Sequence, residues 1–216
     1  MINLIWDLDG TVINSEDEVF DSLLKAISEN GLDINKTIVP LRIGPTIDIL
    51  LKTSFSPDYL TEEKLKGVIS SFRRIYDNSP FDKTPAFEGI ENIFKDTRRY
   101  NHFILTNKPD FPSKRILEKL GFNMFVKRLF TPYSFGGDVK LPKSELFSRL
   151  ISEENLEKEK TFGIGDMEGD CKAAHNAGIK AIGVLWGTGT KEELSKCEYI
   201  VKTVVELESL LGNIYA

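Results

Sequence analysis

The sequence WDLDGT at residues 6–11 directly follows the apolar run INLI at residues 2–5. The apolar run predicts a buried strand, and the polar residues after it predict a loop at the carboxyl end of that strand. Two carboxylates this close repel and raise each other's pKa unless a positive charge lies between them. An ordinary turn beside Gly10 needs only one of Asp7 and Asp9, so the pair indicates a bound cation or a reaction, with a plain turn after the strand as the remaining alternative.

Length and composition are those of an ordinary globular protein. The 216 residues suffice for one domain with a smaller insert, and the 41% hydrophobic and 28% charged content is typical. The formal net charge is −5 and no stretch is rich in lysine and arginine, which argues against binding to nucleic acid. No apolar run is long enough to span a membrane and the N-terminus does not resemble a signal peptide, so we expect a cytoplasmic protein without a membrane partner.

Cysteines and histidines give no sign of a soft-metal site. Cys171 and Cys197 lack C-x-x-C spacing, and His102 and His175 are far apart in the sequence. Any metal bound here is therefore expected to be a hard cation that prefers oxygen ligands.

Strand and helix patterns alternate along most of the chain. Short apolar runs typical of buried strands lie at residues 2–6, 102–106, 128–130, 161–165, 181–186 and 199–201. From residue 86 onward, helical patterns such as residues 113–122 lie between these runs. The alternation predicts an α/β fold with a Rossmann-like parallel sheet covered by helices on both faces.

The alternation is interrupted directly after WDLDGT. Residues 15–85 contain amphipathic helical patterns, the clearest at residues 15–31, and no convincing strand pattern. We expect residues 1–14 and 86–216 to form the catalytic core, with residues 15–85 inserted as an all-helical cap domain. Loops at the carboxyl ends of parallel strands face the ligand, so an insert at this point would cover the site.

Four stretches carry the polar residues best suited to chemistry, and each is expected near the end of a strand. They are DLDGT at residues 7–11, LTNKP at residues 105–109, KLPKSELF at residues 140–147 and GIGDMEGD at residues 163–170. Because the carboxyl ends of parallel strands meet at one edge of a sheet, we expect these stretches to converge there.

Together these residues could hydrolyse a phosphate ester. Asp7, Asp9 and Asp166 offer three oxygen ligands suited to Mg²⁺, which also accepts substrate phosphate as a ligand. Asp7 could attack phosphorus as a carboxylate nucleophile, and Asp9 could act first as general acid and then as general base. Thr106, a lysine and backbone N–H groups after Asp7 could hold the phosphate oxygens.

In their order and spacing, the four stretches resemble the motifs of the haloacid dehalogenase-like phosphatase superfamily, in particular its phosphoglycolate phosphatase-like branch with a helical cap. The resemblance covers nearly the whole chain, with DLDGT as the first motif, LTNKP as the second and GIGDMEGD as the fourth. It implies Asp7 as nucleophile and Asp9 as acid–base residue. It also implies Mg²⁺ held by the Asp7 side chain, the Asp9 backbone carbonyl and Asp166, with Asp170 acting on the metal from its outer shell.

Phosphate binding is expected to involve the second and third motifs and one residue of the cap. Thr106 and Asn107 are the candidates in LTNKP. In the third motif many relatives have a Lys-Pro pair, which KLPK lacks; Lys143, directly before a polar, acidic and apolar helix start, fits a variant of the motif better than Lys140. In the cap, Arg42 precedes GPT in a loop expected to face the site, where an arginine could bind a substrate carboxylate or second phosphate.

The expected function is Mg²⁺-dependent hydrolysis of a small phosphorylated metabolite, such as phosphoglycolate or a nucleotide, by a monomer or small homo-oligomer. Three alternatives stay open. A haloacid dehalogenase would use Asp7 but need neither Asp9 nor Mg²⁺. A sugar phosphomutase shares every core residue. A receiver-type signalling module also combines an acidic cluster with a threonine and a lysine, but it usually fills one uninterrupted domain of about half this length.

Overall fold

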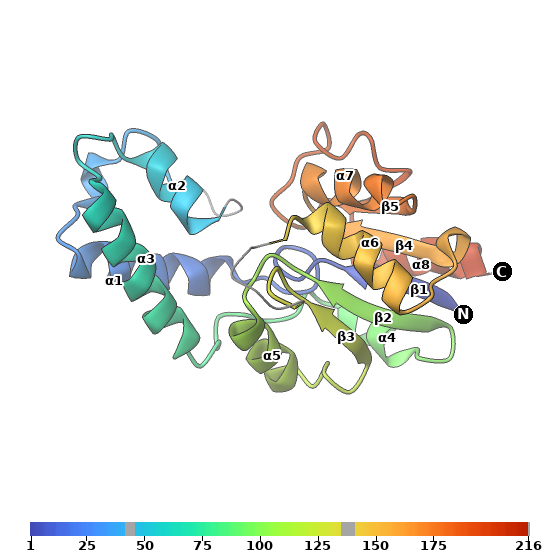
Figure 1. Cartoon of the computed structure of the whole chain (residues 1–216). Helices are drawn as coiled ribbons and strands as arrows, with labels where there is room; N and C mark the ends of the chain where they lie inside the picture. Colours follow the sequence, from blue (N-terminus) through green and yellow to red (C-terminus); the bar gives the residue numbers. More distant parts are fainter. Residues whose placement is uncertain (42–45, 135–140, 216) are drawn as a thin grey trace. The chain divides into compact units, whose positions relative to one another are not determined.

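The chain divides into one unit built on a β-sheet and one built from helices (Figure 1). The structure is a computed structural model, and it describes residues 1–41, 46–134 and 141–215. The sheet unit comprises Met1–Asn14 and Pro85–Ala216, and the helical unit comprises Ser15–Thr84. The division expected from the sequence placed the second boundary one residue later, and the action of the helical unit as a cap stays a prediction.

A parallel β-sheet forms the centre of the sheet unit. Within the described residues its six strands are β1 (Ile2–Trp6), β2 (Tyr100–Leu105), β3 (Val126–Phe130), β4 (Thr161–Gly165), β5 (Lys180–Val184) and β6 (Tyr199–Val201). Their order across the sheet is β3-β2-β1-β4-β5-β6, and all neighbouring pairs are parallel. Each apolar run expected to be a strand overlaps one of them, so the predicted parallel α/β sheet is confirmed.

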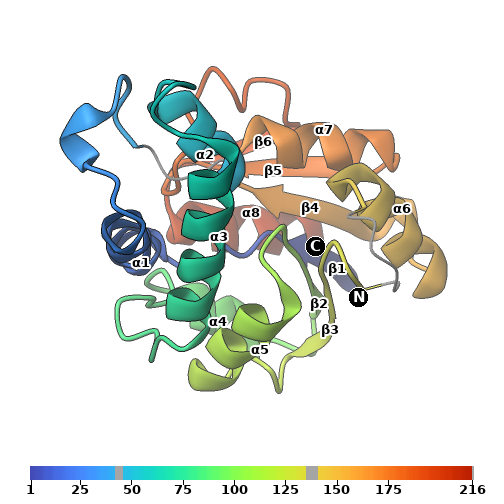
Figure 2. The same cartoon turned by 60° about the vertical axis from the view of Figure 1, so that its left-hand side comes forward.

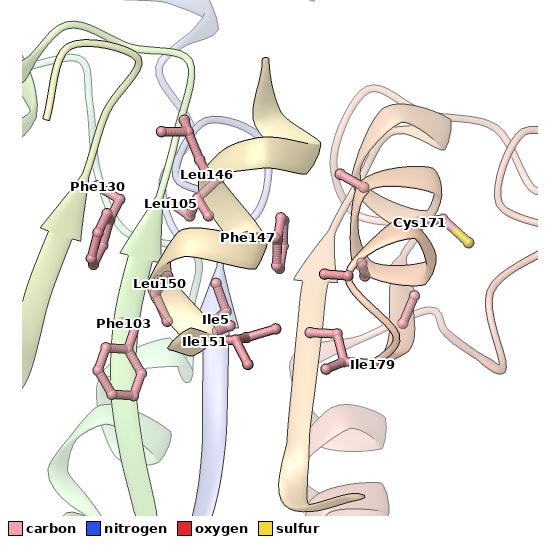
Figure 3. Packing of buried hydrophobic residues seen from close by; sticks show 14 residues of the cluster. Ile5, Phe103, Leu105, Phe130, Leu146, Phe147, Leu150, Ile151, Cys171 and Ile179 are labelled. Atoms are coloured by element: carbon pink, nitrogen blue, oxygen red, sulfur yellow. The ribbon is translucent and has the colours of Figure 1, made fainter. Parts of the chain in front are cut away.

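Helices cover both faces of this sheet. They are α4 (Ile90–Lys95), α5 (Asp110–Lys119), α6 (Lys143–Glu153), α7 (Glu168–Asn176) and α8 (Val204–Tyr215), with a short 3₁₀ helix, η2, at Lys158–Lys160. The helices α6 and α7 pack on one face, and α4 and α8 lie on the other (Figures 1 and 2). Leu146 and Phe147 lie four and three residues before Leu150, so the three side chains share one side of α6. They are buried in one cluster with Ile5 of β1 and Phe103 of β2 (Figure 3).

The strand order places β1 where the chain changes direction across the sheet. From β1 the chain adds β2 and β3 on one side, and then β4, β5 and β6 on the other. Loops that follow strands on either side of such a point diverge and leave room for a ligand at the carboxyl ends. The ends of β1, β2 and β4 are therefore where the candidate site should lie.

The helical unit has an apolar core of its own. It contains α1 (Glu16–Glu29), α2 (Ile47–Ser54), α3 (Glu62–Asp77) and a 3₁₀ helix, η1, at Ile34–Lys36. Leu23 and Ile27, one turn apart on α1, are buried in one cluster with Leu65 and Val68 of α3. Across the described residues of both units, no helix combines the length and apolar character needed to cross a membrane.

Candidate active site

The central strand β1 ends directly before Asp7, and the chain then folds into a tight loop. The N–H of Asp7 donates to the carbonyl of Ile164 in β4 at 2.8 Å, so pairing with the sheet holds its backbone. Beyond it, the carbonyl of Leu8 accepts the N–H of Ile13 at 3.0 Å, and Gly10 takes a positive φ of 76°. Glycine adopts this conformation without the strain that a side chain would add, which lets the loop turn back.

Three carboxylates meet at this end of the sheet. One oxygen atom from each of Asp7, Asp166 and Asp170 lies within 4.8 Å of the others. Asp166 directly follows β4 and is only 1% exposed. Asp170 lies in the first turn of α7, where its Oδ2 accepts the N–H of Met167 at 3.0 Å. Since N–H groups at a helix start lack partners within the helix, they favour a carboxylate here and fix its position.

A lysine lies against two of these carboxylates. Nζ of Lys143, the first residue of α6, is 2.5 Å from Oδ1 of Asp7 and also donates to Oδ1 of Asp170. The start of α6 thus delivers a positive charge to the end of β1. Lys140, the other candidate in this motif, and Arg42, the candidate from the cap, lie outside the described residues.

The electrostatics of this cluster reflect burial and a shortage of positive charge. Burial raises the pKa of Asp7 well above its ordinary value; Lys143 lowers it, and the charges of Asp170 and Asp166 add to the rise. Burial also raises the pKa of Asp166, although the hydrogen bond from the Thr188 N–H lowers it in part. Burial alone would lower the pKa of Lys143, but Asp170 and Asp7 together raise it above its usual value. The single positive charge of Lys143 therefore does not neutralise the three carboxylates.

Asp9 has a lysine of its own. Its Oδ1 is 2.9 Å from Nζ of Lys108, whose side chain is only 6% exposed. The N–H of Lys108 donates to Oγ1 of Thr106 at 3.1 Å, so this buried threonine, directly after β2, shapes the loop that carries the lysine. Asn107 between them is exposed. Sequence reasoning named Thr106 and Asn107 but missed Lys108, although it stands beside them in LTNKP.

The loop after β5, with the sequence GTGT at residues 187–190, was also not predicted to be part of the site. Thr188 donates to Oδ2 of Asp166 twice, from its backbone N–H at 2.8 Å and from Oγ1 at 3.0 Å. Oγ1 of Thr11, the last residue of DLDGT, donates to Oδ1 of Asp166 at 3.2 Å. A glycine-rich stretch directly after a strand is the signal that could have marked this loop as part of the site.

The donor set fits a hard divalent cation. Asp7, Asp166 and Asp170 present only oxygen atoms, which is the ligand type that Mg²⁺ prefers. When all are ionised, these three negative charges and the one positive charge of Lys143 leave an excess of two negative charges. Both oxygens of Asp170 already accept hydrogen bonds, from Lys143 and from the N–H of Met167, which suits an outer position better than direct coordination.

The sequence matches the family model of the haloacid dehalogenase-like hydrolases over residues 4–184. The chain belongs to this family. Its relatives include a 5'-nucleotidase of Pseudomonas aeruginosa, 24% identical over 196 residues, which are 89% of this chain and 86% of that protein. They also include a phosphoglycolate phosphatase of Aquifex aeolicus, 27% identical over 187 residues, which are 85% of this chain and 84% of the relative.

The fold also matches solved structures of this hydrolase family. A haloacid dehalogenase-like family protein of Streptococcus pneumoniae aligns with a TM-score of 0.82 at 18% identity, covering 97% of this chain and 98% of that one. The resemblance to the phosphoglycolate phosphatase-like branch, inferred from the four motifs, is confirmed by these comparisons. The roles of the individual site residues stay predictions.

Proposed function

We propose that this hydrolase is a Mg²⁺-dependent phosphatase that cleaves a small phosphomonoester through an aspartyl-phosphate on Asp7. The observation that carries the proposal is the cluster of Asp7, Asp166 and Asp170 around Lys143 at the carboxyl ends of β1 and β4. Relatives named as a 5'-nucleotidase and a phosphoglycolate phosphatase support the reaction class, and they suggest a nucleotide or a small phosphorylated acid as the substrate.

In the first half-reaction, a carboxylate oxygen of Asp7 attacks phosphorus, and the bond between phosphorus and the leaving oxygen breaks. The protonated Asp9 side chain gives its proton to that oxygen, so that the product leaves as an alcohol. The two residues lie on one tight loop after β1, whose backbone hydrogen bonds keep their relative positions fixed. Lys143, against Oδ1 of Asp7, orients the nucleophile.

In the second half-reaction, the Asp9 carboxylate takes a proton from water, and the resulting hydroxide attacks phosphorus. The bond between phosphorus and the Asp7 oxygen breaks, inorganic phosphate leaves and the Asp7 carboxylate is restored. The ion pair with Lys108 holds the ionised Asp9 side chain in place when it takes the proton from water.

Phosphate binding in this scheme uses Thr106 and Lys143. Because Oγ1 of Thr106 already accepts the N–H of Lys108, its hydroxyl proton is available to donate to a phosphate oxygen. An ammonium has three N–H donors, and Asp7 and Asp170 accept two of those of Lys143; among the described residues nothing else accepts the third, which is proposed to bind phosphate. Asn107 is a further proposed phosphate contact, and Arg42 is proposed to bind a substrate carboxylate or second phosphate. The helical unit is proposed to act as a cap that excludes bulk water.

Asp7, Asp166 and the Asp9 backbone carbonyl would hold Mg²⁺, with Asp170 acting from its outer shell. When bound, the ion would offset the excess negative charge and draw electron density from the phosphate oxygens.

Phosphate release from a panel of phosphomonoesters, with Mg²⁺ and with EDTA, tests the proposal. The panel should contain phosphoglycolate, nucleoside monophosphates, sugar phosphates and pyrophosphate. Release that needs the metal and is concentrated on one compound would support a phosphatase and identify its substrate class. Metal-independent release, or silence across the panel, would refute it. Conversion of a sugar monophosphate to its isomer with a bisphosphate activator would identify a phosphomutase instead.

A further inference from the structure

We infer that Thr188, in the loop after β5, is a positioning residue that orients the Asp166 carboxylate for cation binding. The inference rests on the proposed Mg²⁺ site and adds a residue to it that none of the four motifs contains. Thr188 lies 22 residues beyond Asp166 in the sequence, but it donates both its backbone N–H and its hydroxyl to Oδ2 of that residue.

The two hydrogen bonds distinguish the two oxygens of Asp166. A carboxylate oxygen has two lone pairs, and Thr188 occupies both on Oδ2, at 2.8 and 3.0 Å. Within the part of the chain that the structure describes, Oδ1 accepts one hydrogen bond, from Oγ1 of Thr11 at 3.2 Å. Oδ1 therefore keeps a lone pair for a cation, and the structure assigns it as the metal-facing oxygen.

The Thr188 hydroxyl has a second acceptor nearby, the Met167 sulfur at 3.3 Å. One hydroxyl carries one proton, so the two acceptors compete for it. A carboxylate is a much stronger acceptor than a thioether, and a hydrogen bond to an ionised group is about twice as strong as a neutral one. The proton therefore goes to Asp166.

The glycines on either side of Thr188 show how closely this loop approaches Asp166. A Cβ atom added at Gly187 would lie 2.4 Å from Cβ of Asp166, and one added at Gly189 would lie 1.8 Å from the Asp166 carbonyl oxygen. No side chain fits at either position. The GTGT sequence thus serves two needs: the glycines allow contact with Asp166, and the threonine supplies donors at the contact.

The loop is also tied to the loop that carries the nucleophile. Nε1 of Trp186 donates to the carbonyl of Thr11 at 3.0 Å, and the hydroxyl of Thr11 donates to Asp166. Asp166 is therefore held between two loops that bond to each other. Hydrogen-bond partners of metal-ligating carboxylates typically contribute 10- to 100-fold in metal affinity, about the size of effect expected here.

The test measures Mg²⁺ binding without substrate, by isothermal titration calorimetry and by the rise of the melting temperature with Mg²⁺ concentration. Thr188→Val keeps the shape and the backbone N–H but removes the hydroxyl. We expect its Mg²⁺ dissociation constant to rise about 10-fold. Thr188→Ser, which keeps the hydroxyl, should restore binding to within a small factor of the unmodified protein.

Thr190→Val is the matched control, because it makes the same chemical change in the same loop. The Thr190 hydroxyl accepts the N–H of Glu193 at 3.3 Å, so its loss should leave Mg²⁺ affinity unchanged. If Thr188→Val only lowers the melting temperature in EDTA and binds Mg²⁺ as tightly as the unmodified protein, the positioning role is wrong while the proposed function stands. If the unmodified protein does not bind Mg²⁺, the proposed function fails and this inference fails with it.

Discussion

Lowering the pH should destabilise the sheet unit through one buried histidine. His102 of β2 is fully buried; its ring stacks on Phe94 at 4.6 Å between centroids, and its Nδ1 accepts the Nε1 proton of Trp6 at 3.2 Å. Burial lowers the pKa of His102 from 6.5 to about 4. Between these values the unfolded chain binds a proton that the folded chain does not, so the free energy of unfolding falls as the pH falls.

The two pKa values set the size of this effect. The difference between the two pKa values corresponds to a loss of about 3 kcal/mol in the free energy of unfolding once the pH is below the folded-state pKa. Of this, about 2 kcal/mol is lost between about pH 7 and about pH 5, where the unfolded histidine is almost fully protonated and the buried one is still neutral.

Urea unfolding of the unmodified protein and of His102→Asn at these two pH values isolates the contribution. The Asn amide oxygen can replace Nδ1 as acceptor for Trp6, and the variant cannot titrate in this range. The variant should be less stable at neutral pH because it packs less well, but it should lose about 2 kcal/mol less on acidification. Other titrating groups, such as the buried carboxylates of the site, are common to both proteins and cancel in the difference. Equal losses in the two proteins would refute a depressed pKa for His102.

Two further predictions concern the loop after β1. Asp7→Asn keeps the size of the side chain but removes the nucleophile, so phosphate release should fall by about 10⁴-fold or more while the urea midpoint in EDTA is not lowered; substantial turnover would contradict the covalent mechanism. Gly10→Ala places a Cβ 2.3 Å from Oδ2 of Asp166 at a φ of 76°, so it should lose about 1–2 kcal/mol of stability and also weaken Mg²⁺ binding in calorimetry. Gly121→Ala has a similar φ of 71° and no neighbour within 4 Å, so it should show the stability loss alone; weaker Mg²⁺ binding in both variants would show that the contact with Asp166 is not the cause.

The parallel sheet could be predicted because its strands are short apolar runs separated by helical patterns. Buried central strands such as β1 and β4 need apolar residues on both faces, and that requirement is visible in the sequence. The order of the strands could not be predicted from the sequence, because it depends on which connections pass over the sheet from one strand to a non-adjacent one. It decides that the ends of β1 and β4 are neighbours, which brings Asp7 and Asp166 together.

The carboxylates of the candidate site and Lys143, which contacts two of them, could be named from the sequence, but the other partners could not. An aspartate pair at the end of a strand is unusual enough to suggest chemistry, whereas a single lysine or threonine in a loop has many ordinary uses. Lys108 and Thr188 gain their meaning from contacts with Asp9 and Asp166, which lie far away in the sequence. The fold shows which of these polar loop residues contact a carboxylate of the site.

The lysines explain how two carboxylates can stand two residues apart at the end of a buried strand. Asp7 is paired with Lys143 from the start of α6, and Asp9 is paired with Lys108 from the loop after β2. The two aspartates therefore do not depend on one shared cation. In the proposed mechanism, this separation would let Asp7 attack while Asp9 exchanges protons, because Lys108 lies next to Asp9 and would balance a change in its charge. The excess negative charge lies instead on the group of Asp7, Asp166 and Asp170, which is where the proposed divalent cation would bind.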